Sequence, residues 1–218
     1  MAEGVKGRRR YDSSRRRAQA EATRRDILEA ARRLFERRGY AATTMEAIAA
    51  EAGVALKTVY VAFETKSGLL RALWNHLLRA GRDDVPIADQ QWYRALLEER
   101  DPERQLRLAA RASRVNKLRI AGVLEVIRSA APIDPDIGAL WGRIQTEFHA
   151  NQRAIVESLA AKQALAPDLG VERGADILWT INHPNVWQLL VEERGWSPLD
   201  YERWCADLAC GQLLAPRP

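Results

Sequence analysis

Residues 43–63, TTMEAIAAEAGVALKTVYVAF, constrain the fold most, because they hold two short helical patterns on either side of Gly53. The first pattern, which ends before this glycine, has a small apolar face formed by Ile48, Ala49 and Ala52. The second pattern covers residues 56–63 and is too short to be stable as an isolated helix. Other helices must therefore support it, and its outward side is presented for a purpose other than packing.

A helical wheel divides residues 56–63 into two sides. The inward side, within about 100°, is expected to consist of Leu56, Val59, Tyr60 and Phe63. The outward side consists of Lys57, Thr58, Val61 and Ala62. Two short helices joined by a tight glycine turn, after a third helix, are typical of the helix-turn-helix, whose second helix enters the DNA major groove. We therefore expect the outward side to contact DNA.

Helical spacing continues through the rest of the chain, with no strand pattern and no internal repeat. Asp101–Pro102, Asp134–Pro135 and Ser197–Pro198 each resemble an N-cap followed by proline in the first helical turn. The helices expected after a first one from about Thr23 to Gly39 are 43–52, 56–63, 65–78, 88–98, 102–115, 118–131, 134–163, 171–193 and 197–214. Pro184 should kink or break the helix over 171–193. The predicted fold is all-α, with nine to ten helices.

The positive charge lies at the N-terminus. The whole chain has a formal net charge of +5, and residues 1–25 hold nine Lys and Arg against three acidic residues. The stretch GRRRYDSSRRR has few apolar residues, so residues 1–20 are expected to form a flexible basic arm. Such an arm, through Arg8, Arg9 and Arg10, would be attracted to DNA phosphates, and a solubilising tail is the alternative.

Composition argues against several other classes of protein. Hydrophobic residues make up 47% and charged residues 29% of the chain, and no apolar run approaches the ~20 residues that span a bilayer. The basic N-terminus is not followed by the apolar segment of a signal peptide. Cys205 and Cys210 are too far around one helix to form a disulfide. We expect a cytoplasmic protein that does not enter a membrane.

The sequence ILEAARRLFERRGY, followed by TTMEAIAAEAGVALKTVYVAFETKSGLL, resembles the DNA-binding domain of the TetR family of bacterial repressors over residues 23–75. The positions in register are Gly39, Tyr40, Thr43, Thr44, Ile48, Ala49, Gly53, Val54, Thr58, Val59, Tyr60, Phe63, Lys66, Leu69 and Leu70. The resemblance implies a helix-turn-helix domain over residues 21–66, with the motif at about 44–63. It also implies a helical effector-binding and dimerisation domain over residues 67–218.

The resemblance also implies which residues contact DNA: Thr44, Leu56, Lys57, Thr58, Tyr60, Val61 and Lys66. Lys57 and Thr58 would contact base edges or a nearby phosphate, while Tyr60, Lys66 and Thr44 would hold phosphates. Thr44 and Thr58 could instead be caps or surface residues, and Tyr60 could belong to the core. The family commonly has a capping residue at Ala55 and polar residues at Val61 and Ala62, so base recognition here should depend on apolar contact, which favours thymine methyl groups.

The C-terminal part carries an apolar stripe: Ile137, Trp141, Ile144, Phe148, Ile155 and Leu159. Such a stripe is either core or the wall of a cavity, and nearby polar groups favour a cavity. The residues expected to bind an effector are Trp141, Phe148, His149, Trp179, Asn182 and His183. No cluster of arginine falls on the stripe, so we expect an apolar or aromatic small molecule, neutral or weakly charged.

Residues 174–204 are similar to the C-terminal helices with which many TetR-family members dimerise. The interface residues expected here are Trp187, Leu190, Tyr201, Trp204 and Leu208. The predicted function is a ligand-responsive repressor that binds a palindromic operator as a homodimer and is released by its effector. The alternatives are an architectural or activator DNA-binding protein with no effector, and a helical enzyme or carrier.

Catalytic and metal-binding motifs are absent from the sequence. There is no G-x-S-x-G, P-loop or C-x-x-C. The side chains His76, His149, His183 and Glu147 come from different predicted helices and lack the spacing of a metal site. The sequence therefore predicts no enzyme activity, no metal and no cofactor.

Overall fold

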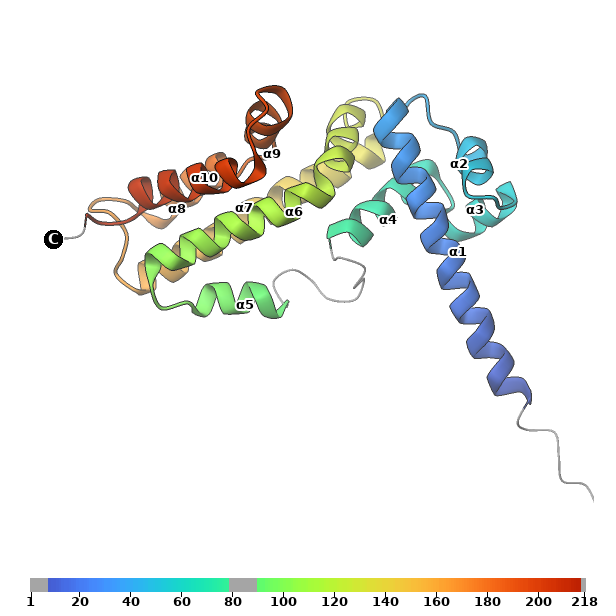
Figure 1. The fold of residues 1–218 in the computed structure, drawn as a ribbon, viewed down its shortest axis with the longest axis horizontal. Coiled ribbons are helices and arrows are strands. Elements are labelled where there is room, and N and C mark those ends of the chain that lie inside the picture. Colours follow the sequence, from blue (N-terminus) through green and yellow to red (C-terminus); the bar gives the residue numbers. More distant parts are fainter. Residues whose placement is uncertain (1–7, 79–89, 217–218) are drawn as a thin grey trace, which may run out of the picture.

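A computed structural model describes residues 8–78 and 90–216 of the chain (Figure 1). One end of the molecule contains α1 (Arg8–Arg38), α2 (Met45–Glu51), α3 (Leu56–Phe63) and α4 (Lys66–Leu78). The remaining helices are α5 (Gln91–Glu98), α6 (Pro102–Ala130), α7 (Pro135–Ala161), α8 (Val171–Ile181), α9 (Pro184–Trp187), the π-helix η2 (Gln188–Glu193) and α10 (Pro198–Leu213). Over the described ranges there is no strand, only an isolated bridge between Leu165 and Leu214. The predicted all-α class is confirmed.

α1 begins at Arg8, well before the expected helix start near Thr23, and its N-terminal half projects away from the other helices (Figure 1). No glycine or proline interrupts residues 8–38. Its arginine, alanine, glutamine and glutamate residues favour helix, so the helix held by buried residues 27–35 extends outward at little cost. The arm expected to be flexible is therefore a helical extension from residue 8 onward, whereas residues 1–7 lie outside the described part of the chain.

The caps of α2 and α4 are set by threonine. Thr44 is the N-cap of α2, and its side chain accepts a hydrogen bond from the Ala47 amide. Thr65 caps α4 by accepting from the Gly68 amide at 2.9 Å. The neighbouring Thr43 does not cap α2, because its hydroxyl is buried and donates to the Gly39 carbonyl at 2.8 Å.

α6 is one continuous helix, where the sequence predicted two over 102–115 and 118–131. The polar pair Asn116 and Lys117 interrupts the apolar spacing, but no glycine or proline between residues 103 and 121 breaks the backbone. Asp101 caps α6 and Asp134 caps α7, as predicted. The predicted break at Pro184 is also confirmed, because His183 has an extended backbone and separates α8 from α9.

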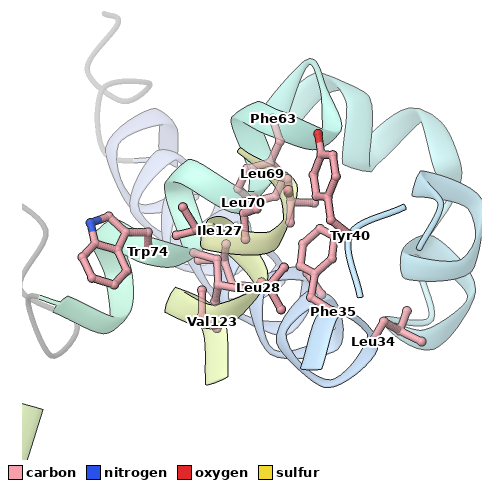
Figure 2. Close-up of a cluster of buried hydrophobic side chains, with 14 of the residues drawn as sticks. Leu28, Leu34, Phe35, Tyr40, Phe63, Leu69, Leu70, Trp74, Val123 and Ile127 are labelled. Carbon is pink, nitrogen blue, oxygen red and sulfur yellow. The ribbon is translucent and has the colours of Figure 1, made fainter. Parts of the chain in front are cut away.

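A first core cluster, buried among α1 to α4, also includes residues of α6 and α7 (Figure 2). Phe35 and Leu70 lie at its centre with Ile127 of α6, and all three side chains are fully buried. This cluster crosses the domain boundary expected at residue 66. The helix-turn-helix and the near ends of α6 and α7 therefore share one apolar interior.

A second cluster lies among α5, the first half of α6, the second half of α7, α8 and α10. Its centre is formed by Leu159, Leu178, Tyr201 and Leu213, each at most 1% exposed. α6 and α7 run side by side and reach both clusters (Figure 1). They therefore connect the two ends of the molecule.

Candidate nucleic-acid interface and interior cavity

The connection between α2 and α3 is a tight turn at Gly53, whose φ of +66° lies in the left-handed region. Glycine adopts this conformation without strain because it has no Cβ. The Gly53 amide donates to the Ala50 carbonyl at 3.2 Å, and the Val54 amide donates to the Ala49 carbonyl at 3.0 Å. These bonds satisfy the end of α2 and direct the chain into α3, which packs against α2 and α4.

α3 buries a narrow line of residues and exposes the rest. Val59 and Phe63 are buried, Leu56 is half-buried, and the exposed side chains include Lys57 and Thr58. Val61 is 76% exposed and Tyr60 is 44% exposed. The wheel-based expectation that Tyr60 faces inward is therefore wrong, because residues spaced four apart suffice to pack so short a helix. Tyr60 instead extends the exposed face of α3.

Both ends of α3 depend on its surroundings. Ala55 is the N-cap and forms no side-chain capping bond, in line with the departure noted in the sequence. At the other end, Arg24 of α1 donates from Nη1 to the Ala62 carbonyl at 2.9 Å. Its guanidinium carbon also lies 4.3 Å from the centre of the Phe63 ring. No sequence pattern indicated this role for Arg24, because its partners lie 38 or more residues further along the chain.

Lys66 is turned toward the protein. Its Nζ donates to the Tyr40 carbonyl at 2.8 Å and to the Thr43 carbonyl at 3.0 Å, and lies 4.2 Å from the centre of the Tyr40 ring. Burial lowers the pKa of this ammonium. These bonds hold the loop between α1 and α2, a structural role that the resemblance did not imply. Its contact with phosphate stays a prediction.

Thr44 and the basic arm complete the predicted DNA contacts. The Thr44 side chain is exposed, and its oxygen accepts from the Ala47 amide at 3.1 Å, so the hydroxyl can still donate to a phosphate. The backbone of Arg8, Arg9 and Arg10 forms the first turn of α1, while their side chains lie outside the described part of the structure.

A cavity of about 160 Å³ lies where the two core clusters meet. α4 contributes Trp74 and Leu78, α5 contributes Trp92 and Tyr93, and further walls come from α6, α7, α9 and η2. Three of the six predicted effector contacts line it: Trp141, Phe148 and Asn182. The aromatic walls suit an apolar organic molecule, and a cavity of this volume is large enough for about one benzene-sized ring.

The other three predicted contacts are engaged elsewhere. The His149 Nε2 pairs with the Asp176 carboxylate at 2.9 Å, and the Trp179 ring lies edge-on to His183 at 4.7 Å between centroids. His183 caps α9 by accepting from the Asn185 amide on Nδ1 at 3.2 Å. Burial and the charges of Lys117 and Arg128 lower the pKa of His183. These three residues do not line the cavity.

Two of the three buried polar residues that line the cavity were not predicted from the sequence. Lys117, Gln152 and Asn182 line it and are all buried. Lys117 donates from Nζ to the Ser113 hydroxyl and to the Asn182 carbonyl, the latter at 2.9 Å. The Asn182 amide nitrogen donates to Gln152 Oε1 at 3.3 Å. The only available signal was the interruption of apolar spacing at Lys117, which the prediction took for the end of a helix.

Two of the expected dimer contacts are already covered within one chain. Trp187 and Tyr201 are buried and meet edge-to-face at 5.0 Å between centroids. They cannot offer surface to a partner, so assigning them to an interface is wrong. Leu190, Trp204 and Leu208 are half-buried. The exposed apolar side chains near this end are Leu189, Trp196 and Leu199.

Metal-binding clusters and membrane-spanning helices are both missing from the part of the chain that the structure describes. Among those residues, no group of three His, Cys, Asp or Glu side chains could hold a metal ion. No helix in the described ranges is long and apolar enough to cross a membrane.

Comparisons with known proteins agree with this architecture. Residues 27–73 match the family described as bacterial regulatory proteins, tetR family. The regulator TtgR of Pseudomonas putida is 36% identical over 107 residues, which cover 46% of this chain and 50% of TtgR. The probable regulator ArpR of Pseudomonas putida is also 36% identical over 107 residues, with the same coverage. The chain thus matches about half the length of these curated relatives.

Solved structures resemble nearly the whole chain. NalD of Pseudomonas aeruginosa, described as the secondary repressor of the MexAB-OprM multidrug efflux pump, superposes with a TM-score of 0.68. The two share 22% identity over 90% of this chain and 98% of NalD. SmeT in complex with triclosan gives a TM-score of 0.66 and 17% identity, over 90% of this chain and 98% of SmeT. At these identities the likeness concerns the fold alone.

Proposed function

Because residues 27–73 match the tetR family of bacterial regulatory proteins, we propose that the chain is a ligand-responsive transcriptional repressor of this family. It binds a palindromic operator as a homodimer and leaves it when a small molecule occupies the cavity. One observation carries this proposal: α4 starts beside α3 and ends with Trp74 and Leu78 in the cavity wall. A single helix therefore contacts both the candidate DNA-binding unit and the candidate effector site.

In this proposal, α3 is the recognition helix. Its exposed residues Lys57, Thr58, Tyr60 and Val61 enter the major groove, with Leu56 at its start. Lys57 and Thr58 supply hydrogen bonds, while the methyl groups of Val61 suit contact with thymine. The Thr44 hydroxyl holds a phosphate from the N-terminus of α2, where the helix dipole favours an anion.

The basic helical extension supports binding without sequence preference. Residues 14–20 of α1 are exposed and include Arg15, Arg16 and Arg17. Such a cluster attracts DNA phosphates and makes the affinity dependent on salt. We propose that the chain has three functional parts. They are a basic arm over residues 1–20, a DNA-binding domain over 21–66, and an effector-binding and dimerisation domain over 67–218.

Two hydrogen bonds connect the start of α7 to the DNA-binding unit. The Tyr40 hydroxyl donates to the Asp134 carboxylate at 2.5 Å, and the Ser67 hydroxyl donates to the Asp136 carboxylate at 3.0 Å. The bond from Tyr40 lowers the pKa of Asp134, so this carboxylate is charged near neutral pH. Further along, α7 lines the cavity with Trp141 and Phe148. A ligand that shifts α4 or α7 would therefore move α3.

Dimerisation sets the distance between the two recognition helices, which must match half-sites about one helical turn, or ~34–36 Å, apart. We assign the interface to η2 and α10, through the half-buried Leu190, Trp204 and Leu208 and the exposed Leu199. An effector releases DNA only if it binds the state with displaced recognition helices more tightly than the DNA-bound state. The effector that the aromatic walls suit is apolar or aromatic.

The alternative is an architectural or activator protein whose C-terminal part only dimerises. The cavity with its aromatic walls and buried polar groups favours the ligand-responsive form, since a purely structural core would not need them. A helical enzyme or carrier is set aside because the family consists of regulatory proteins.

The test is an electrophoretic mobility shift with the duplex upstream of the protein's own gene, combined with a thermal-shift screen of small aromatic molecules. We expect a specific shift that is abolished by a compound that also raises the melting temperature. A matched pair of variants isolates the cavity: Trp141→Ala should lose the response to the compound, while Trp196→Ala, outside the cavity lining, should keep it. Absence of any operator shift would refute the repressor, and a shift insensitive to every stabilising compound would favour the alternative.

A further inference from the structure

Lys117 is the only charged side chain that the structure buries within the described residues, and it lies in the wall of the cavity. Its ammonium has three N–H donors. Two of them are paired, with the Ser113 hydroxyl and the Asn182 carbonyl. The Tyr201 ring lies 5.3 Å from Nζ and adds a weak attraction for the cation.

No carboxylate of the described residues forms an ion pair with Lys117. Glu125, also in the lining, is held by Arg128 at 2.8 Å, and Glu147 and Glu192 are exposed at the rim. A buried ammonium without an anionic partner is costly, because its desolvation is not offset by a countercharge. Burial accordingly lowers the pKa of Lys117 to about 8, so the side chain is still a cation at pH 7.

The titratable groups that face Lys117 from the neighbouring helices are neutral at this pH. Burial raises the pKa of Tyr201 and of Cys205, both on α10, and lowers the pKa of His183 at the end of α8. The cavity therefore contains one unbalanced positive charge. Gln145 adds a buried amide nitrogen with no hydrogen-bond partner among the described residues.

We propose that the cavity binds a monoanionic amphipathic ligand, an aromatic or alkyl carboxylate, whose carboxylate pairs with Lys117 and whose apolar body lies against Trp141 and Phe148. This inference rests on the proposed function in that it concerns the effector of the same cavity. A carboxylate has two oxygens, so it can accept from Lys117 and from the Gln145 amide together. A polyanion does not fit, because Arg128 is already held by Glu125 and leaves a single unbalanced cation.

The sequence analysis expected a neutral or weakly charged effector. This proposal narrows the class of effector to molecules with a single negative charge. That expectation considered only the stripe on α7, where no cation falls. The cation comes from α6, and only the packing of α6 against α7 and α10 brings it into the cavity.

The experiment measures binding by isothermal calorimetry on the full-length protein without DNA. The probes are acid and amide pairs of nearly equal shape: benzoate and benzamide, 2-naphthoate and 2-naphthamide, octanoate and octanamide. For at least one pair we expect the carboxylate to bind about tenfold or more tightly than its amide. Lys117→Met should abolish this preference by weakening only the carboxylate.

Lys162→Met is the matched control, since Lys162 is half-buried but bonds to Gln105 and Ser158, both outside the cavity lining. It should keep the preference for the carboxylate. If Lys117→Met does not fold, Lys117→Gln carries the same comparison, because its amide can still donate to the Asn182 carbonyl. Carboxylate binding should also weaken in the wild type as pH rises above about 8, where Lys117 loses its proton, while amide binding stays constant.

The proposal would be overturned if acid and amide bound with equal affinity in every pair. It would also be overturned if the preference for the carboxylate persisted in Lys117→Met. No binding of any probe at millimolar concentration would overturn it too, together with the effector half of the proposed function. A Lys117-dependent carboxylate that binds without changing operator affinity would support this inference and count against ligand-released repression alone.

Discussion

In the core shared by α1 to α4, the buried polar side chains are Thr43 and Ser67, and each hydroxyl donates a hydrogen bond, to the Gly39 carbonyl and to Asp136. Toward α8 and α10 the interior instead buries Gln105, Lys117, Gln152 and Asn182. Within the described residues, the buried side-chain atoms without a hydrogen-bond partner all come from the segment α6 to α10: Arg119 Nε, Gln145 Nε2, Trp179 Nε1, Asn182 Oδ1 and Tyr201 Oη.

The difference matches what each region must do. A recognition helix must hold its side chains in one geometry, and a fully paired, dry core provides that rigidity. Of the unpaired atoms, Gln145 Nε2 and Asn182 Oδ1 belong to residues that line the cavity, and an effector site can retain such groups at a cost in stability because their partners arrive with the ligand. The cavity lies between the two, where ligand binding can alter how α4 and α7 hold the DNA-binding unit.

The largest expected effect is the loss of core packing beside the recognition unit. Phe35→Ala removes a fully buried ring and should lower the free energy of unfolding by about 3–5 kcal/mol. Phe148→Ala, at a half-buried position beside an existing cavity, should cost about 1 kcal/mol, because less new void is created. Urea denaturation of both variants checks this, and equal losses would mean that the two interiors are packed alike.

Lys117, buried in the cavity wall, should make the free energy of unfolding depend on pH. Its folded pKa of about 8 lies below the ordinary lysine value of 10.5, so burial of the charge destabilises the protein by up to about 3 kcal/mol below pH 8. This penalty disappears between pH 8 and 10.5, where the folded protein has released the proton that the unfolded chain still binds.

Lys117→Met removes this titration. The stability of the variant relative to wild type should therefore fall as pH rises from about 8 to 10.5, while the contribution of Tyr201 is common to both proteins. Denaturation at several pH values measures the difference, and a constant difference across this range would show that Lys117 is not desolvated.

Substitution of two glycines by alanine tests how tightly two helix contacts are packed. Gly68 lies at the junction of α3 and α4, and Gly122 lies at the contact of α1 with α6. A Cβ at Gly68 would lie 2.5 Å from the Phe63 carbonyl oxygen, which belongs to backbone and cannot yield cheaply. Gly68→Ala should therefore destabilise the protein by about 2 kcal/mol and weaken operator binding by shifting the end of α3.

At Gly122 the new Cβ would meet only the flexible Glu36 carboxylate, at 2.8 Å. Gly122→Ala should be neutral or stabilising by up to about 1 kcal/mol, because alanine favours helix. Thermal unfolding of both variants tests the pair. A stable Gly68→Ala protein with normal operator affinity would contradict the rigidity that we assign to this junction.

The smallest effects are expected from alanine substitutions of two lysines in the DNA-binding unit, Lys57 and Lys66, and these effects should differ in kind. Lys57→Ala should leave the melting temperature unchanged and reduce the salt dependence of operator binding by about one phosphate contact. Lys66→Ala should instead lower stability by about 1 kcal/mol, because its bonds to the Tyr40 and Thr43 carbonyls are lost. Binding titrations at several salt concentrations distinguish them, and a reduced salt slope for Lys66→Ala would restore its predicted phosphate contact.

Local interactions made much of this fold predictable from the sequence. The caps at Asp101, Asp134, Ser197 and Thr65, and the break at Pro184, follow from bonds and steric contacts within a few residues. The α2–α3 unit was predictable for the same reason, since Gly53 and the apolar spacing around it act within one turn. The all-α class and the family resemblance therefore needed no tertiary information.

Orientation of side chains on short or extended helices could not be derived locally. Tyr60 lies near the boundary of its helical wheel, and only the packing of α3 against α2 and α4 exposes it. The burial of Trp187 and Tyr201 likewise depends on how the segment after Pro184 folds back onto α10. Apolar composition alone could not tell core from interface.

The sequence by itself determined the order and ends of most helices, the helix-turn-helix and the resemblance to the TetR family, because these depend on neighbours within one or two turns. Only the tertiary structure decided which polar residues meet. Tyr40 reaches Asp134 across 94 residues, and Lys117 reaches the Asn182 carbonyl across 65. Such pairs form only when whole helices pack, because burial makes each bond matter and no local pattern selects the partner.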